Sequence, residues 1–164
     1  DAGRPRLAGK VIFARPFGRA AQQGVRLASR DEVAAFIAAE FPQTKCTVLD
    51  VGNRGATVAH AVGAAELRPG GTVSGPVLMS VADVALYVAI LGEIGIVPLA
   101  VTTSLNINFM RKPSADSDII GECRLMKVGR SLAVGEVWLY SEGMEEPVAH
   151  VTGTYAIPPE TDTP

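Results

Sequence analysis

Residues 74–91 read SGPVLMSVADVALYVAIL and are apolar on nearly every side of a helix. Pro76 sets the start of this helix near Gly75, because the fixed φ of proline is already helical and its missing N–H has no intrahelical partner in the first turn. Gly92 and Glu93 interrupt the run before the roughly 20 apolar residues that a membrane span needs. The stretch therefore predicts a soluble core helix that is buried all round.

Asp83 is the only charged residue between Val77 and Leu91. Burying a carboxylate among apolar side chains is costly unless it has partners. Two interpretations are open. In the structural one, Asp83 pairs with an arginine or caps a neighbouring helix. In the functional one, it is a catalytic base or nucleophile, since carboxylates in unusual surroundings cluster at active sites.

Composition limits the classes of function. The chain has 164 residues, 48% of them hydrophobic, and a net charge of about -2, which fits one folded domain and gives no electrostatic reason for binding nucleic acid or an anionic membrane. Cys46 and Cys123 lie in apparent strands without metal-ligand spacing, so we expect reduced thiols and no metal site. Because no secretory signal is recognisable, we expect a cytoplasmic protein that binds small molecules or other proteins.

The chain divides into three parts by pattern. Residues 1–43 form an arginine-rich arm followed by a short helix, and we assign no chemistry to the arm. Residues 44–157 form the main domain, and residues 158–164 form a tail. Ser29 and Glu32 have the spacing of a capping box, which predicts that the short helix begins there.

From Thr44 the apolar period changes to two. We expect a strand at Lys45–Val51, a turn at Gly52–Gly55 and a second strand at Ala56–Glu66. His60 lies in the second strand with no obvious cysteine or histidine partner, which favours a structural or solvent-facing role over a ligand role.

The clearest strand pattern is Leu99–Met110, where apolar residues alternate with polar ones. Thr103 belongs to the apolar set, which leaves two interpretations: its hydroxyl points towards the helix, or, as is more common for a threonine in a strand, it makes a local hydrogen bond. Three further strands joined by short loops predict an antiparallel meander: Ile119–Val128, Leu132–Tyr140 and Val148–Ile157. The expected fold is α+β, with a sheet of about six strands curled round the long central helix.

Several motifs in this order match one family. In that family a His-Gly-Gly opens a buried helix, an Asp follows nine positions after the His, and a later strand begins with threonines and ends in a basic residue and a proline. The corresponding stretches here are Ser74-Gly75-Pro76, then Asp83, then Val101–Ser104 and Met110–Pro113. With Gly129-Arg130-Ser131 and Gly153–Ile157, the region 44–157 resembles the hot-dog fold and, more narrowly, the phenylacetate-pathway (PaaI-like) acyl-CoA thioesterases.

The resemblance implies an activity and an assembly. Asp83 is then the general base or nucleophile of thioester hydrolysis, and backbone N–H groups at the helix start hold the oxyanion. The active sites are then at the boundary of a homodimer, or of a homotetramer. Three positions depart from the family: its histidine is Ser74, its second glycine is Pro76, and the asparagine six residues before the histidine is Arg68. Pro76 has no N–H to donate, which leaves Gly75 and Val77 as donors.

The substrate implied by the resemblance is a small or medium acyl or aryl-acyl coenzyme A, with no further cofactor. Ser74 or Thr103 would orient the water or the carboxylate. Arg111, Lys112 and Arg130 are candidates for the phosphates of coenzyme A, or else a solvated rim. The substrate-binding set also includes Arg68, Val77 and Ser131. Alternatives are a hot-dog protein that binds acyl-CoA without turnover, and a structural oligomer in which Asp83 is an ion-pair partner.

Overall fold

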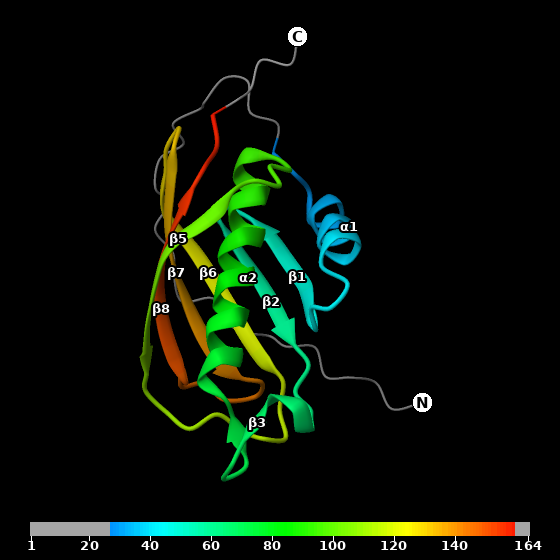
Figure 1. Cartoon of the computed structure of the whole chain (residues 1–164), viewed down its shortest axis with the longest axis vertical. Helices are drawn as coiled ribbons and strands as arrows, with labels where there is room; N and C mark the ends of the chain where they lie inside the picture. The colour runs from blue at the N-terminus through cyan, green and yellow to red at the C-terminus, as the bar shows by residue number, and fades with distance from the viewer. Residues whose placement is uncertain (1–26, 160–164) are drawn as a thin grey trace.

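The computed structural model describes residues 27–159, in which an antiparallel sheet curves round one long helix (Figure 1). Two segments lie outside the described residues: residues 1–26 of the expected arm and residues 160–164 of the expected tail. The elements in chain order are α1 (Arg30–Glu40), β1 (Cys46–Gly52), β2 (Gly55–His60), the 3-10 turn η1 (Ala64–Glu66), β3 (Leu67–Arg68), β4 (Thr72–Val73), α2 (Gly75–Ile94), β5 (Val101–Phe109), β6 (Ile119–Val128), β7 (Leu132–Ser141) and β8 (Ala149–Ala156).

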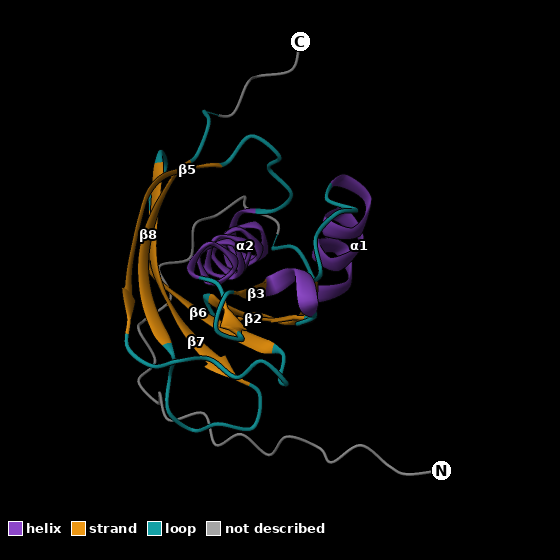
Figure 2. Cartoon of the chain, turned by 60° about the horizontal axis from the view of Figure 1, so that its bottom comes forward, coloured by secondary structure: helices purple, strands orange, loops and turns teal. Residues whose placement is uncertain are grey.

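The main sheet has the strand order β1-β2-β6-β7-β8-β5, and all its neighbours are antiparallel. The predicted meander of three strands is confirmed as β6-β7-β8. Figure 2 shows the sheet bending around α2, with α1 on one side of α2, and Figure 1 shows α1 next to β1. The expected α+β class, with about six strands around a central helix, is confirmed.

Helix α1 begins as the sequence predicts. The Ser29 hydroxyl accepts a hydrogen bond from the Glu32 N–H at 3.2 Å, and the Glu32 carboxylate accepts one from the Ser29 N–H at 2.8 Å. This reciprocal pair satisfies two donors that the first helical turn leaves unpaired. Val33 and Ile37 on the inner face of α1 are buried, so the short helix covers one flank of the core.

The β1–β2 hairpin turns at the expected residues but its second strand is shorter than expected. Asn53 and Arg54 have φ of 51° and 59°, the left-handed values that a tight hairpin turn requires. Strand β2 ends at His60 rather than Glu66. The backbone leaves the ladder because the Gly63 N–H donates to Glu66 Oε2 at 2.7 Å, a side-chain bond that replaces a cross-strand one.

Helix α2 packs closely against the concave face of the sheet. Gly135 on β7 and Gly153 on β8 are cross-strand partners beneath Leu86, and a Cβ at either position would collide with the Leu86 side chain. The helix has the length and composition of a membrane span, but its residues from Ala85 to Gly92 are all buried within the fold. The packing makes it a core helix.

The expectation that α2 is buried all round is wrong for its first half. Pro76 and Ser80 are exposed, and Asp83 and Val84 are only half-buried. These residues recur at the spacing of one helical face. The curved sheet covers the opposite face, so an open stripe runs along α2.

Strand β5 is the exposed edge of the sheet. Only Leu105 and Ile107 of its apolar set are half-buried, while Val101 and Phe109 are 54% and 56% exposed. The alternation that predicted β5 therefore marks a strand correctly, but its apolar side is only partly covered by this chain.

Candidate active site

A cavity of about 660 Å³ opens beside the uncovered stripe of α2. Its wall combines α2, α1, the strand ends of the β1–β2 hairpin, the loop before β5, and β8. Its lining residues are Ile37, Phe41, Gln43, Thr44, Lys45, His60, Glu66, Ser80, Asp83, Val84, Tyr87, Pro98, Ala100, Val101, Thr102 and Tyr155. The wall thus combines apolar side chains with two groups of polar ones.

The first group is centred on Asp83. The Thr102 hydroxyl on β5 donates to Asp83 Oδ1 at 2.6 Å, and the Tyr155 hydroxyl on β8 lies 2.7 Å from the same oxygen. No hydrogen bond from residues 27–159 reaches Oδ2. Two hydroxyl donors therefore fix the carboxylate through one oxygen and leave the other free to act on a ligand.

Burial raises the pKa of the Tyr155 phenol, and the neighbouring Asp83 carboxylate raises it further. Both effects keep the phenol protonated and able to donate. The ion-pair interpretation of Asp83 is not what the structure shows, since the partners of its side chain within the described part of the chain are hydroxyls.

A β-bulge decides which threonine serves Asp83. Thr102 pairs with Tyr155 and Ser104 pairs with Thr154, so Thr103 is the extra residue between them. The bulge shifts the alternation by one residue and turns Thr102 towards α2. The Thr103 hydroxyl instead donates to the Thr154 carbonyl at 3.2 Å. Of the two interpretations of Thr103, the structure therefore shows the local hydrogen bond and not the helix-facing hydroxyl.

The start of α2 carries unpaired donors. Ser74 occupies the N-cap position, but its hydroxyl makes no capping hydrogen bond. Leu78 N–H is bonded to the Ser74 carbonyl, and Pro76 has no N–H, so Gly75 and Val77 hold the free backbone donors of the first turn. The helix dipole adds partial positive charge there, which suits an oxyanion.

These donors are far from Asp83 of the same chain. Eight residues separate Gly75 from Asp83, which is about 12 Å along the axis at about 1.5 Å per residue. Ser74, Gly75 and Val77 also do not line the cavity. One carbonyl group cannot touch both ends, so a single chain does not bring together all the residues predicted from the sequence.

The predicted phosphate-binding residues are also dispersed, and none of them lines the cavity. Arg111 follows β5 and is held by Glu146, with Nε and Nη2 at 2.9 and 3.0 Å from its two carboxylate oxygens. Arg130 and Ser131 are exposed in the β6–β7 turn at the opposite end of the sheet, where the Ser131 carbonyl bonds the Ile157 N–H. Arg68 and Lys112 are exposed.

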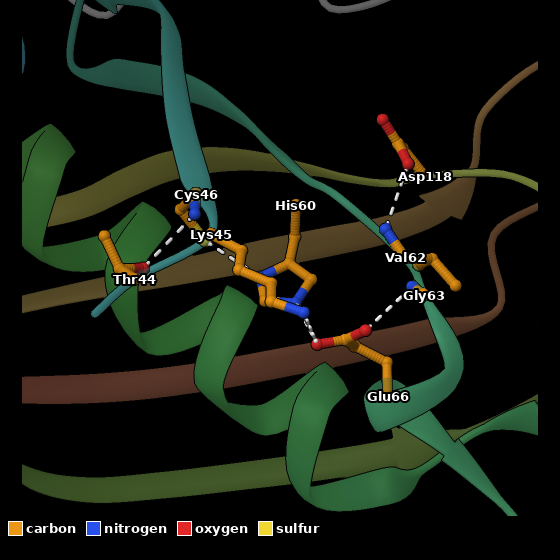
Figure 3. A network of polar contacts seen from close by, with 8 residues as sticks. All are labelled: Thr44, Lys45, Cys46, His60, Val62, Gly63, Glu66 and Asp118. Carbon is orange, nitrogen blue, oxygen red and sulfur yellow. Dashed lines mark hydrogen bonds and ion pairs between the residues drawn. The ribbon is translucent and has the colours of Figure 1, made fainter. Parts of the chain in front are cut away.

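The second polar group on the wall was missed by the sequence interpretation. Lys45 Nζ lies 2.6 Å from Glu66 Oε1, and His60 Nε2 lies 4.0 Å from the same oxygen. On its other side, His60 Nδ1 is 3.4 Å from the Cys46 sulfur. Figure 3 shows the imidazole between β1 and the η1 turn. His60 therefore does have a cysteine partner, contrary to the expectation from the sequence.

A second bulge hides this pairing. Val48 pairs with Val58 and Asp50 with Thr57, so Leu49 is extra and Cys46 falls opposite His60. Counting outward from the hairpin turn without the bulge places Thr47 there instead. Only the polar character of His60 and Glu66 next to the second strand offered a signal, and it did not indicate their position on the cavity wall.

Comparison with known proteins places the chain in a family. A model of the thioesterase superfamily matches residues 70–148. The solved structure of a candidate thioesterase from Silicibacter sp. TM1040 is 44% identical, with 84% of this chain and 97% of that one covered and a TM-score of 0.76. The chain belongs to the thioesterase superfamily. A comparison with curated proteins finds no match.

Within the thioesterase superfamily, the hot-dog fold and the PaaI-like type are confirmed. A mutant of the phenylacetic acid degradation protein PaaI from Thermus thermophilus is 27% identical, covering 76% of this chain and 99% of that one with a TM-score of 0.62. PaaI from E. coli is 19% identical, covers 81% of this chain and 96% of that one, and has a TM-score of 0.68. At that identity it supports the fold alone.

Proposed function

We propose that this chain hydrolyses acyl-CoA thioesters, with Asp83 as the general base or the nucleophile. One observation carries the proposal: two hydroxyls hold Asp83 Oδ1 on the cavity wall, while no hydrogen bond from residues 27–159 reaches Oδ2. The cavity volume of about 660 Å³ is within the usual range of small-molecule sites. We propose a small or medium acyl or aryl-acyl group as the substrate, and such a group fits within this volume.

The carboxylate has two routes to the same products. As a base, Asp83 takes a proton from a water whose oxygen bonds to the thioester carbon. As a nucleophile, Oδ2 itself bonds to that carbon, and water then releases the acyl group. In both routes the carbon–sulfur bond breaks, the thiolate of coenzyme A leaves and is protonated, and a carboxylic acid is formed. The hydroxyls of Thr102 and Tyr155 hold the carboxylate in position.

The oxyanion site is assigned to a second copy of the chain. The carbonyl oxygen becomes negative during attack and needs donors within about 3 Å, whereas Gly75 and Val77 are about 12 Å and about 9 Å from Asp83 along α2. A second α2 running antiparallel beside the first would place its own first turn near Asp83. The active site would then contain residues of both copies.

The exposed strand β5 supports this assembly. A long edge strand with apolar side chains invites pairing with another strand, and Leu99, Val101, Phe109 and Met110 are exposed along this edge. Pairing of β5 with the same strand of a second copy would cover them and continue the sheet. Light scattering at micromolar concentration is expected to show a dimer or a larger assembly; a monomer would contradict the shared site.

Release of free thiol from a panel of acyl-CoA esters tests the activity, with calorimetric binding of the same esters measured in parallel. Hydrolysis that is lost in Asp83→Asn supports the proposal. Saturable binding without any thiol release would instead indicate a hot-dog protein that binds acyl-CoA without hydrolysing it. The missing N–H of Pro76 would then be the physical reason for the lack of turnover. If the chain neither binds nor hydrolyses the esters, the remaining interpretation is a structural oligomer.

A further inference from the structure

The second polar group on the cavity wall has an unpaired donor. His60 is 9% exposed and Glu66 is 6% exposed, so both are more than nine-tenths buried. His60 Nε2 is enclosed and has no hydrogen-bond partner among residues 27–159. An unpaired buried polar atom costs about 1–3 kcal/mol, which is a reason to look for the group that pairs with it.

The neighbours of His60 define its tautomer. Burial raises the pKa of the Cys46 thiol, so its S–H is retained and can donate to His60 Nδ1, 3.4 Å away. Burial lowers the pKa of His60 itself, which favours the neutral imidazole. In the tautomer in which the Cys46 S–H donates to Nδ1, the ring proton is on Nε2, and this N–H faces the Glu66 carboxylate (Figure 3).

Glu66 supplies a fixed acceptor. The hydrogen bond from Lys45 and that from the Gly63 N–H lower the pKa of its carboxyl, so the group stays ionised. At 4.0 Å, the distance from His60 Nε2 to Glu66 Oε1 is too long for a direct hydrogen bond. An oxygen placed about 2.8 Å from each atom bridges this gap.

The bridging group must accept from His60 and donate to Glu66. A water molecule or a ligand hydroxyl does both, and a ligand hydroxyl that takes the place of the water keeps both hydrogen bonds. A carboxylate or a ketone cannot donate to Glu66, an ammonium cannot accept from His60, and a methyl group does neither. We infer that His60 and Glu66 form a subsite for a hydroxyl group on the acyl portion of the substrate, at the end of the cavity that they line. The inference rests on the proposed acyl-CoA function.

Access requires one side chain to move. His60 Nε2 has no exposed surface, and Lys45 lies against the same Glu66 oxygen with its side chain 48% exposed. Turning Lys45 towards solvent breaks its ion pair with the buried Glu66 carboxylate, so the bound hydroxyl has to replace Lys45 as the hydrogen-bond partner of Glu66. The apolar wall next to the subsite, which includes Ile37, Phe41 and Tyr87, would hold the rest of the acyl group.

Binding to the Asp83→Asn variant tests the subsite without requiring turnover. The probes are hexanoyl-CoA and benzoyl-CoA, each compared with its series of esters carrying one hydroxyl at successive positions. At least one hydroxylated ester is expected to bind about tenfold or more tightly than its parent. His60→Leu should remove this preference, His60→Gln should restore part of it, and Gln43→Ala, a polar change elsewhere on the wall, should leave it unchanged.

Three outcomes would overturn the inference. One is the absence of any preference across both series, and the second is a preference that survives His60→Leu in a variant whose melting temperature shows that it folds. The third is an equal loss of affinity for all esters in His60→Leu, which would mean that His60 contacts the coenzyme A portion that they share. Failure of the proposed hydrolysis is detected separately, because it appears in thiol release by the unmodified chain.

Discussion

The two polar groups on the cavity wall differ in how their charged side chains are paired. Asp83 receives two hydroxyl hydrogen bonds on one oxygen and keeps the other oxygen free. His60 and Glu66 balance charge through Lys45 and leave a donor unpaired. A carboxylate oxygen without a hydrogen bond from residues 27–159 can take a proton or attack a carbon. The His60 N–H faces a carboxylate that Lys45 already pairs, and we propose that it binds a hydroxyl group. We therefore propose that the Asp83 group carries out the hydrolysis and that the group of His60 and Glu66 binds part of the substrate.

The largest effect is expected from Asp83→Asn. The amide keeps the shape and can still accept from Thr102 and Tyr155, but it cannot act as a base or nucleophile. Turnover should fall by about a hundredfold or more, with little change in ligand affinity or melting temperature. The measurement is thiol release next to calorimetric binding. Near-normal turnover would remove Asp83 from the mechanism and erase the difference between the two groups.

Pro76→Gly is expected to act in the opposite direction. It adds a backbone donor at the start of α2, and one donor aimed at an oxyanion contributes up to about a hundredfold in rate. Glycine also increases the entropy of the unfolded chain, so we expect a stability loss of up to about 1 kcal/mol. Turnover and melting temperature measured on one preparation separate the effects. A lower melting temperature with no faster hydrolysis would mean that Gly75 and Val77 already suffice.

Thr102→Val and Thr103→Val form a matched pair at the bulge, since Thr103 is its extra residue and Thr102 precedes it. Thr102→Val removes one of two donors to Asp83 Oδ1, so we expect turnover to fall by roughly tenfold, the worth of one hydrogen bond to a charged group. Thr103→Val removes a bond to the Thr154 carbonyl and should change turnover by less than about twofold. The reverse order of effects would show that the alternation continues through the bulge in solution.

The smallest effect is expected in the pH dependence of stability. Burial lowers the pKa of His60 in the folded chain, so the unfolded chain binds protons more readily and acidification below about pH 6.5 favours unfolding. The contribution is present above that pH and lost below it. Urea unfolding at pH 7.5 and pH 5.5 should show a stability loss that is smaller in His60→Leu. An equal loss in both proteins would mean that His60 is readily protonated in the fold.

Sequence alone was sufficient wherever the signal is local. The Ser29 capping box, the helix start at Gly75 and the turn at Gly52–Gly55 each depend on a few adjacent residues, whose backbone preferences do not change with the rest of the fold. The curled sheet follows from the order of these elements. The importance of Asp83 could also be recognised, because a single carboxylate in an apolar helix needs an explanation wherever the helix packs.

Tertiary structure decided the partners. Tyr155 is 72 residues from Asp83, and Thr102 replaces Thr103 because one extra residue shifts the register of β5. A second extra residue brings Cys46 opposite His60. Side chains alternate with a period of two, so a bulge moves every later residue to the other face of the strand. The local pattern predicts that a strand is present, but which hydroxyl reaches the carboxylate depends on pairing between distant segments.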